Sequence, residues 1–129
     1  MNLPAELRYT KDHEWARLED DGSVVVGITA HAVEQLGDIT MVTLPDVGST
    51  TEKDQPFGDV DSVKAVSELF APLDAEVLET NGNLEDEPEK VNEDPYGEGW
   101  MIKLKPSEAG AYEGLLDAAA YKKLLEEQD

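Results

Sequence analysis

The stretch that decides the fold is a run of alternating apolar residues interrupted by one lysine. It reads Asp59-Val60-Asp61-Ser62-Val63-Lys64-Ala65-Val66-Ser67-Glu68-Leu69-Phe70. Two β-prone segments separated only by Lys64-Ala65 predict a tight β-hairpin. Such a hairpin places the lysine amine at a protruding turn, open to another protein. The amine is therefore a candidate attachment point, and the spacing alone leaves open that Lys64 is an ordinary solvated turn lysine.

Composition excludes several classes of function. The chain has 129 residues, a length typical of one domain. Its 30 acidic and 10 basic side chains give a formal charge of −20, which repels nucleic acids and anionic membrane surfaces. There are no cysteines, so any sulfur chemistry must come from a cofactor. With two histidines and no cysteine, we expect no metal site.

The N-terminal segment 1–8 lacks the pattern of a signal or transit peptide. No apolar run approaches the roughly 18–20 residues that cross a bilayer. We expect a protein of the bacterial cytoplasm or, as the alternative, a mature mitochondrial protein, and the Met1 start favours the first.

Short β-prone runs broken by turn residues continue from Arg8 to Trp100, which is typical of an all-β barrel or sandwich. The clearest runs are 24–26, 39–44, 76–79 and 100–105. In the last run, Trp100, Ile102 and Leu104 are expected on one face. The acidic segment 84–99 is rich in Pro, Asn and Gly, so it is expected to be a surface excursion.

Two segments have helical patterns. Thr29 as N-cap and Gly37 as stop predict a short helix near 29–36, with Val33 and Leu36 facing the sheet. The segment 112–126 predicts an amphipathic C-terminal helix. Its expected apolar stripe is Tyr112, Leu116, Ala119, Ala120 and Leu124.

Several separated motifs together resemble the glycine cleavage system H protein family. Besides Asp61-Ser62-Val63-Lys64-Ala65 within the hairpin region 56–81, they are residues 9–15, 26–29, 36–38, 44–45 and 91–100, in the family's order and spacing. The resemblance covers about residues 5–125. It implies a single lipoyl-carrier domain over 1–129, mainly β, as a hammerhead or barrel-sandwich hybrid of two antiparallel sheets. Biotinyl domains typically place methionines beside the lysine, where this chain has Val63 and Ala65.

The resemblance also implies a function. Lipoic acid would be amide-linked to Lys64 and would supply the sulfurs that the chain lacks. The chain would carry an aminomethyl group from pyridoxal-phosphate-dependent glycine decarboxylase to a tetrahydrofolate-dependent aminomethyltransferase, and dihydrolipoamide dehydrogenase would reoxidise the arm. Lipoate-attaching enzymes are further partners. The family implies a carrier without its own active site, and we expect a monomer.

Further site residues follow from the same resemblance. Glu14 and Glu68 are the carboxylates expected near the docked arm, where a negative charge keeps the carried amine protonated. His13 is expected to line the cleft of the arm or to cap a turn. In a chain with 30 acidic residues, the alternative for each carboxylate is an ordinary surface role.

Two positions depart from the family pattern. Asp61 stands where the family usually has Glu, and the enzymes that attach the lipoyl group could recognise that carboxylate. Ala75 stands where the family commonly has Gly, and alanine is strained there if the position needs a positive φ. These departures leave open that the chain is an unmodified acidic interaction module. The same hairpin would also suit a second alternative, a lipoyl or octanoyl donor in a relay to 2-oxoacid dehydrogenases.

Overall fold

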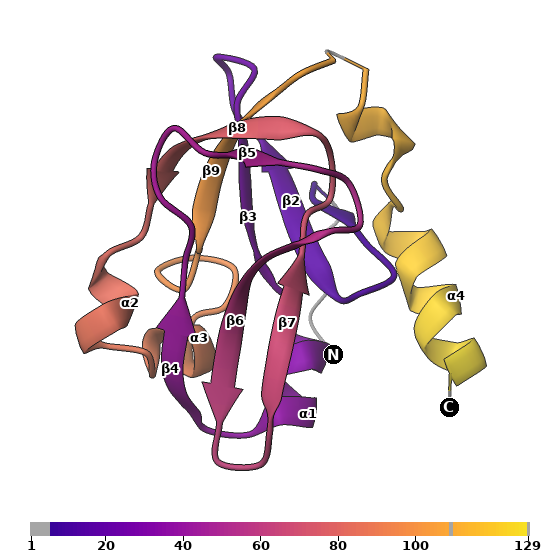
Figure 1. Ribbon diagram of the computed structural model, residues 1–129. Helices are drawn as coiled ribbons and strands as arrows, with labels where there is room; N and C mark the ends of the chain where they lie inside the picture. The colour runs from indigo at the N-terminus through magenta and orange to yellow at the C-terminus, as the bar shows by residue number, and fades with distance from the viewer. Residues whose placement is uncertain (1–5, 109, 129) are drawn as a thin grey trace.

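The computed structural model describes residues 6–108 and 110–128, which form two antiparallel sheets (Figure 1). The first sheet has the strand order β1 (Arg8–Tyr9), β2 (Glu14–Leu18), β3 (Val24–Ile28), β9 (Ile102–Pro106), β8 (Ala75–Thr80) and β5 (Thr50–Thr51). The second has the order β4 (Ile39–Thr43), β6 (Pro56–Ser62) and β7 (Val66–Phe70). The predicted fold class is confirmed.

The triple valine of β3 forms the middle of the larger sheet, and all residues of Val24–Ile28 are buried. The alternating Ile102 and Leu104 of β9 pair with this strand, opposite Val26 and Val24. The same apolar core includes Val60 and Leu69 of the second sheet. One interior therefore holds both sheets together, since removal of apolar surface from water is the main favourable term in folding.

A second cluster is centred on Trp15, which is fully buried. Its indole covers Gly27, where a β-carbon would lie 2.7 Å from the ring, so only glycine fits. Its Nε1 donates to the Pro95 carbonyl oxygen at 2.8 Å. Trp100 packs against this cluster. The expectation that it shares a strand face with Ile102 is wrong, because β9 begins only at Ile102 and the Trp100 amide closes a turn with the Gly97 carbonyl oxygen.

Helix α1 (Ala30–Leu36) forms where its capping residues predict it. The Thr29 side chain accepts a hydrogen bond from the Ala32 amide, and Gly37 ends the helix with a φ of 79°. Such a left-handed φ favours glycine. Val33 and Leu36 pack against the main core, as expected.

The segment 84–99 is more ordered than the expected surface excursion. It contains two single-turn helices, α2 (Asn83–Asp86) and α3 (Lys90–Glu93). Leu84 and Val91 are fully buried in the main core. Two isolated apolar side chains in a polar segment have no periodicity, so the sequence pattern gave no sign of these anchors.

The C-terminal helix starts later than expected, because α4 covers Ala118–Gln128. Tyr112–Gly114 form a separate 3₁₀ turn. Between these elements, Leu116 exchanges two backbone hydrogen bonds with Tyr9 of β1, which keeps this part of the chain extended. Asp117 Oδ1 then accepts the Ala120 amide at 2.8 Å, an N-cap contact that fixes the start of α4.

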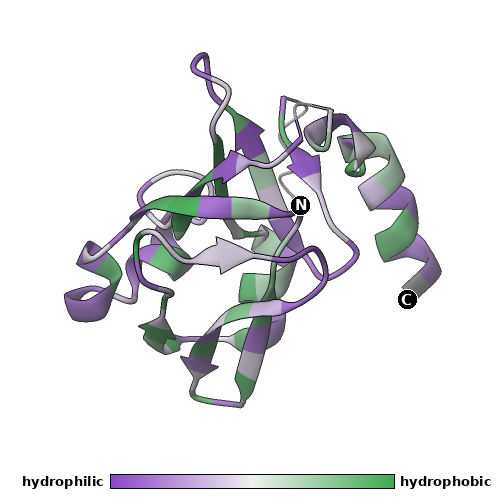
Figure 2. Cartoon of the chain, turned by 45° about the horizontal axis from the view of Figure 1, so that its top comes forward, coloured by the Kyte–Doolittle hydropathy of each residue, from purple (hydrophilic) through white to green (hydrophobic). Residues whose placement is uncertain are grey.

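The face that α4 buries also differs from the expected stripe. Ala119 and Ala120 are exposed, whereas Tyr121 and Leu125 are buried. The Tyr121 ring stacks on Tyr9 at a centroid distance of 4.8 Å. Helix α4 lies along one side of the body (Figure 1), with hydrophobic and hydrophilic residues alternating along it (Figure 2).

Candidate functional site

The lysine turn has three residues, not the two expected. Strand β6 ends at Ser62 and β7 begins at Val66. The Ser62 hydroxyl accepts the amides of Lys64 and Ala65, each at 3.1 Å, and the Ser62 amide donates to the Ala65 carbonyl oxygen at 2.8 Å. Because the serine side chain closes the turn locally, Val63 leaves the strand, and its side chain is 65 % exposed.

Lys64 is exposed at this turn. The turn forms the end of the β6–β7 hairpin, which can be followed in Figure 1. The Lys64 side chain passes the C-terminal end of α1, where a β-carbon on Gly37 would lie 3.4 Å from Lys64 Cε. The Val63 amide also donates to the Asp38 carbonyl oxygen at 3.0 Å. The turn is thus braced against the end of α1 while the amine stays accessible.

On the solvent-facing side of the second sheet, polar and apolar residues lie next to one another across the three strands. Met41, Asp61 and Val66 are register partners across the three strands. In a further row, Asp59 lies directly opposite Glu68, a like-charge pair that costs stability. Met41 and Val66 are 53 % and 70 % exposed. We call Met41, Val63 and Val66 the tip patch.

Glu14 is buried, with 2 % of its surface exposed. Its Oε1 accepts a hydrogen bond from the Thr10 hydroxyl at 2.7 Å, and its Oε2 accepts the Phe70 amide at 3.4 Å. Burial raises the pKa of Glu14 from 4.5 to about 8, because the charged carboxylate is poorly solvated there. Sequence reasoning missed Thr10, although a threonine that opens a polar turn before β2 is a recognisable signal.

Two elements run between Lys64 and Glu14. Along β7, the chain passes from the turn to Phe70, whose amide contacts Glu14. At one end of α1, Gly37 lies beside Lys64. At the other end, the Thr29 amide donates to the carbonyl oxygen of His13, the residue before Glu14. Lys64 and Glu14 therefore lie at opposite ends of β7 and α1, and we call the path along these two elements the route.

The other predicted carboxylates lie along this route, and neither of them is hydrogen-bonded to the Glu14 carboxyl, which bonds to Thr10 and Phe70. Glu68 is exposed and stands two residues before Phe70, so both lie on the same face of β7. Asp61 is half-buried in the row of Met41 and Val66. Ala75 lies in β8, and the positive-φ non-glycine residues of the described chain are His13 and Asp54. The strain considered for Ala75 does not arise.

His13, expected to line the cleft of the arm or to cap a turn, contacts the C-terminal helix. Its Nδ1 lies 2.8 Å from the Tyr121 hydroxyl, which also lies 2.8 Å from Thr29 Oγ1. Its ring is 4.6 Å from the ring of His31. Burial and then the charge of His31 lower the pKa of His13. Within residues 6–108 and 110–128, no three potential metal ligands come together.

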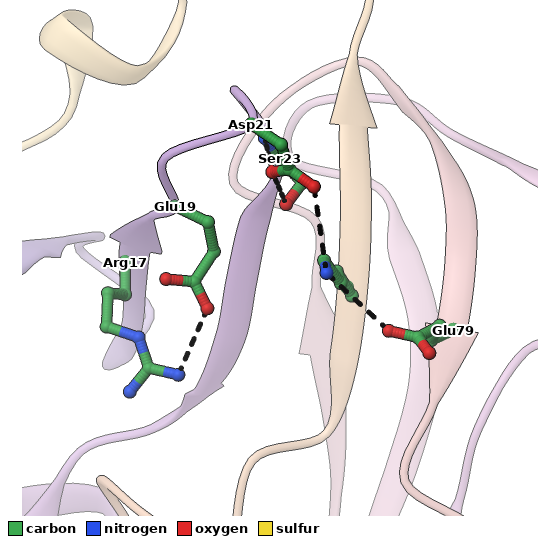
Figure 3. A network of polar contacts seen from close by, with 6 residues as sticks. Arg17, Glu19, Asp21, Ser23 and Glu79 are labelled. Carbon is green, nitrogen blue, oxygen red and sulfur yellow. Dashed lines mark hydrogen bonds and ion pairs between the residues drawn. The ribbon is translucent and has the colours of Figure 1, made fainter.

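Two cations of the larger sheet, Arg17 and Lys103, form surface ion pairs (Figure 3). Lys103 Nζ lies 3.9 Å from Asp21 and 3.7 Å from Glu79, and Arg17 lies 3.4 Å from Glu19. Lys64 has no ion pair with any residue of the described ranges. Its amine is therefore accessible to another protein, whereas that of Lys103 lies beside two carboxylates.

A pH-dependent stability follows from the buried carboxyl. Between about pH 4.5 and 8, Glu14 is ionised in the unfolded chain but protonated in the fold. Wild-type stability should therefore fall with rising pH, by roughly 1.4 kcal/mol per pH unit from this group. Urea unfolding at pH 5 to 8 should show a shallower fall for Glu14→Gln, and the exposed Glu85→Gln should follow the wild type. Parallel curves for wild type and Glu14→Gln would show that Glu14 is already ionised in the fold.

Comparisons with known proteins identify the family. The family model described as "Glycine cleavage H-protein" matches residues 7–128. The chain belongs to the glycine cleavage H-protein family. A glycine cleavage system H protein of Chromobacterium violaceum is 58% identical over 122 residues, 95% of each chain, and one of Anaeromyxobacter sp. (strain K) is 55% identical over the whole of both chains.

A solved structure agrees with this assignment. The crystal structure of a glycine cleavage system H protein from Mycobacterium marinum superposes with a TM-score of 0.88 at 40% identity, covering 96% of this chain and 99% of that one. As a member of this family, the chain is a lipoyl carrier that shuttles an aminomethyl group, and it is not a catalyst. No helix in the described part of the chain is long and apolar enough to span a membrane.

Proposed function

We propose that Lys64 Nζ is the atom that carries the lipoyl group, in amide linkage. The observation behind this proposal is the exposed amine of Lys64, without an ion pair in the described chain, at one end of the route to Glu14. The surroundings fit such a group, because Gly37 leaves room beside Lys64 Cε and the tip patch offers apolar surface to the acyl chain. When attached, the lipoyl group would supply the reactive sulfurs.

We propose that Glu14 receives the aminomethyl group at the other end of the route. A loaded amine decays when its nitrogen lone pair is free to expel the sulfur, so protection requires the ammonium form. Glu14 is held within a largely water-free site and has no cationic partner among the described residues. An arriving ammonium would ionise Glu14, release its proton to solvent and gain the resulting ion pair.

Three further residues have smaller proposed roles. Glu68 adds negative potential along the route, on the same face of β7 as Phe70. Asp61, which pairs with Val66, is recognised by the enzyme that attaches the lipoyl group. His13 holds the loop that precedes Glu14 through its contact with Tyr121.

The test is to load the lipoylated protein with the aminomethyl group and to follow its loss by mass spectrometry after removal of the decarboxylase. Glu14→Gln should lose the group roughly tenfold faster, since a hydrogen bond to a charged group is worth about 1.5–3 kcal/mol. Glu85→Gln, an exposed acidic residue on α2, should decay like the wild type. Equal decay of all three proteins would reject the role of Glu14.

We further propose four kinds of protein partner: glycine decarboxylase, the folate-dependent aminomethyltransferase, dihydrolipoamide dehydrogenase and lipoate-attaching enzymes. The charge of −20 and the carboxylates beside the tip patch fit partner surfaces that have an apolar centre and a basic rim. We place the chain in the bacterial cytoplasm as a monomeric, single-domain carrier, consistent with the bacterial relatives named above.

The tip patch should matter to the attaching enzyme. Met41→Ser removes apolar surface next to Asp61 but far along the sequence from Lys64, and should lower kcat/KM for lipoylation several-fold. Val47→Ser provides a matched control, because Val47 is 62 % exposed and lies in the β4–β5 connection, beyond the opposite end of β4 from the turn. The assay is the rate of mass gain with lipoic acid and ATP. Equal rates for the two variants would remove Met41 from the docking surface.

A further inference from the structure

The hydroxyl of Thr10 makes three contacts in the turn before β2. It lies 2.7 Å from Glu14 Oε1, 3.3 Å from the Asp12 amide nitrogen and 3.2 Å from the Glu14 amide nitrogen. Two backbone hydrogen bonds close the same turn, from the Thr10 amide to the Glu14 carbonyl oxygen and from the His13 amide to the Thr10 carbonyl oxygen. The position of the hydroxyl is therefore set by the backbone.

The direction of the Thr10 hydroxyl proton follows from counting donors and acceptors. A hydroxyl has one proton and two lone pairs. The amides of Asp12 and Glu14 can only donate, so they occupy the two lone pairs. The single proton must then point to Glu14 Oε1, the third neighbour.

This arrangement makes the two oxygens of Glu14 unequal. Oε1 accepts the short Thr10 bond of 2.7 Å, whereas Oε2 has only the Phe70 amide at 3.4 Å. The weakly engaged Oε2 is the oxygen on the side of β7, along which the route from Lys64 runs. It is also the oxygen on which a carboxyl proton can sit without opposing the Thr10 hydroxyl.

We propose that Thr10 is a positioning residue, whose hydroxyl holds Oε1 of Glu14 so that Oε2 is presented to the ammonium of the loaded arm. The inference rests on the proposed role of Glu14. When the ammonium binds, the proton of Oε2 goes to solvent and the Thr10 bond to Oε1 strengthens, since its acceptor is then charged. Thr10 also lines a surface cavity of about 210 Å³ that Glu14 does not line.

The first test uses the protein without its cofactor. The Glu14 carboxyl is titrated by ¹³C NMR in wild type, Thr10→Val and Thr10→Ser. Valine matches the shape of threonine but lacks the hydroxyl, and serine retains it. Because the Thr10 hydrogen bond lowers the pKa of Glu14 against the effect of burial, the midpoint should move to higher pH in Thr10→Val and stay near the wild-type value in Thr10→Ser. An unchanged midpoint in Thr10→Val overturns the proposal.

The second test follows decay of the aminomethyl group on the lipoylated protein from pH 6 to 9. Near neutral pH, Thr10→Val should lose the group about tenfold faster than wild type. The pH range in which the group is protected should also begin at a higher pH. Thr10→Ser should show the wild-type rate and the wild-type pH range. In a Glu14→Gln background, Thr10→Val should add no further loss, because its effect acts through the carboxyl. An equal acceleration at every pH, or no rescue by serine, would reduce Thr10 to a structural residue.

The two proposals can fail separately. Fast decay of Glu14→Gln with normal decay of Thr10→Val overturns the role of Thr10 alone. Normal decay of Glu14→Gln overturns both. If Thr10→Val does not fold, as judged by circular dichroism, Thr10→Ala gives the same readouts, with the same expected direction.

Discussion

Lys64→Arg is expected to abolish lipoylation completely while leaving the fold intact. Arginine retains the positive charge and a similar length, but its guanidinium stays protonated and does not form the amide. Lys64 is exposed and outside both strands of its hairpin, so the substitution removes no core contact. The measurement is intact mass after incubation with a lipoate-attaching enzyme, lipoic acid and ATP.

The matched control is Lys53→Arg, an exposed lysine in the loop before β6. This variant should gain one lipoyl group at the wild-type rate. A mass gain in Lys64→Arg would move the attachment point to another lysine, and normal modification of both variants would contradict the site built around the hairpin.

Trp15→Ala is expected to have the largest effect on stability, a loss of about 3–5 kcal/mol. Trp15 is fully buried, covers Gly27 and donates to the Pro95 carbonyl oxygen. Its removal leaves a cavity between the larger sheet and the segment 94–99, and the partly buried Pro95 carbonyl loses its donor. Urea unfolding followed by far-UV circular dichroism measures the loss.

Trp100→Ala is the comparison for Trp15→Ala. Trp100 belongs to the same cluster but is only half-buried. Its removal should cost clearly less than that of Trp15. Equal losses would mean that burial against Gly27 does not decide the contribution of Trp15.

Local patterns were sufficient where local chemistry fixes the structure. Thr29 and Gly37 cap α1 through contacts within a few residues, and the valines of β3 form a buried strand that pairs with β9. The lysine hairpin was predictable for the same reason. Its turn length was not, because it depends on whether the Ser62 hydroxyl or a second strand accepts the turn amides.

The failures arose where distant residues compete with local propensity. Leu116 is kept extended by its backbone bonds to Tyr9, which lies 107 residues earlier, so the helix expected from residue 112 begins only at Ala118. At the site, the sequence indicated Glu14 but not its burial, nor the hydroxyl of Thr10 that fixes one of its oxygens. The burial of Glu14 appears only when β2 and β7 come together, whereas the Thr10 contact is made within the turn before β2.

The most direct test of the lipoyl-carrier account is the mass of the protein purified from its native host, with the modified peptide mapped. We predict one lipoyl amide per chain, on Lys64, which gains one aminomethyl group when glycine and glycine decarboxylase are added. A native pool without the modification, or with the lipoyl group on any other lysine, would contradict the account.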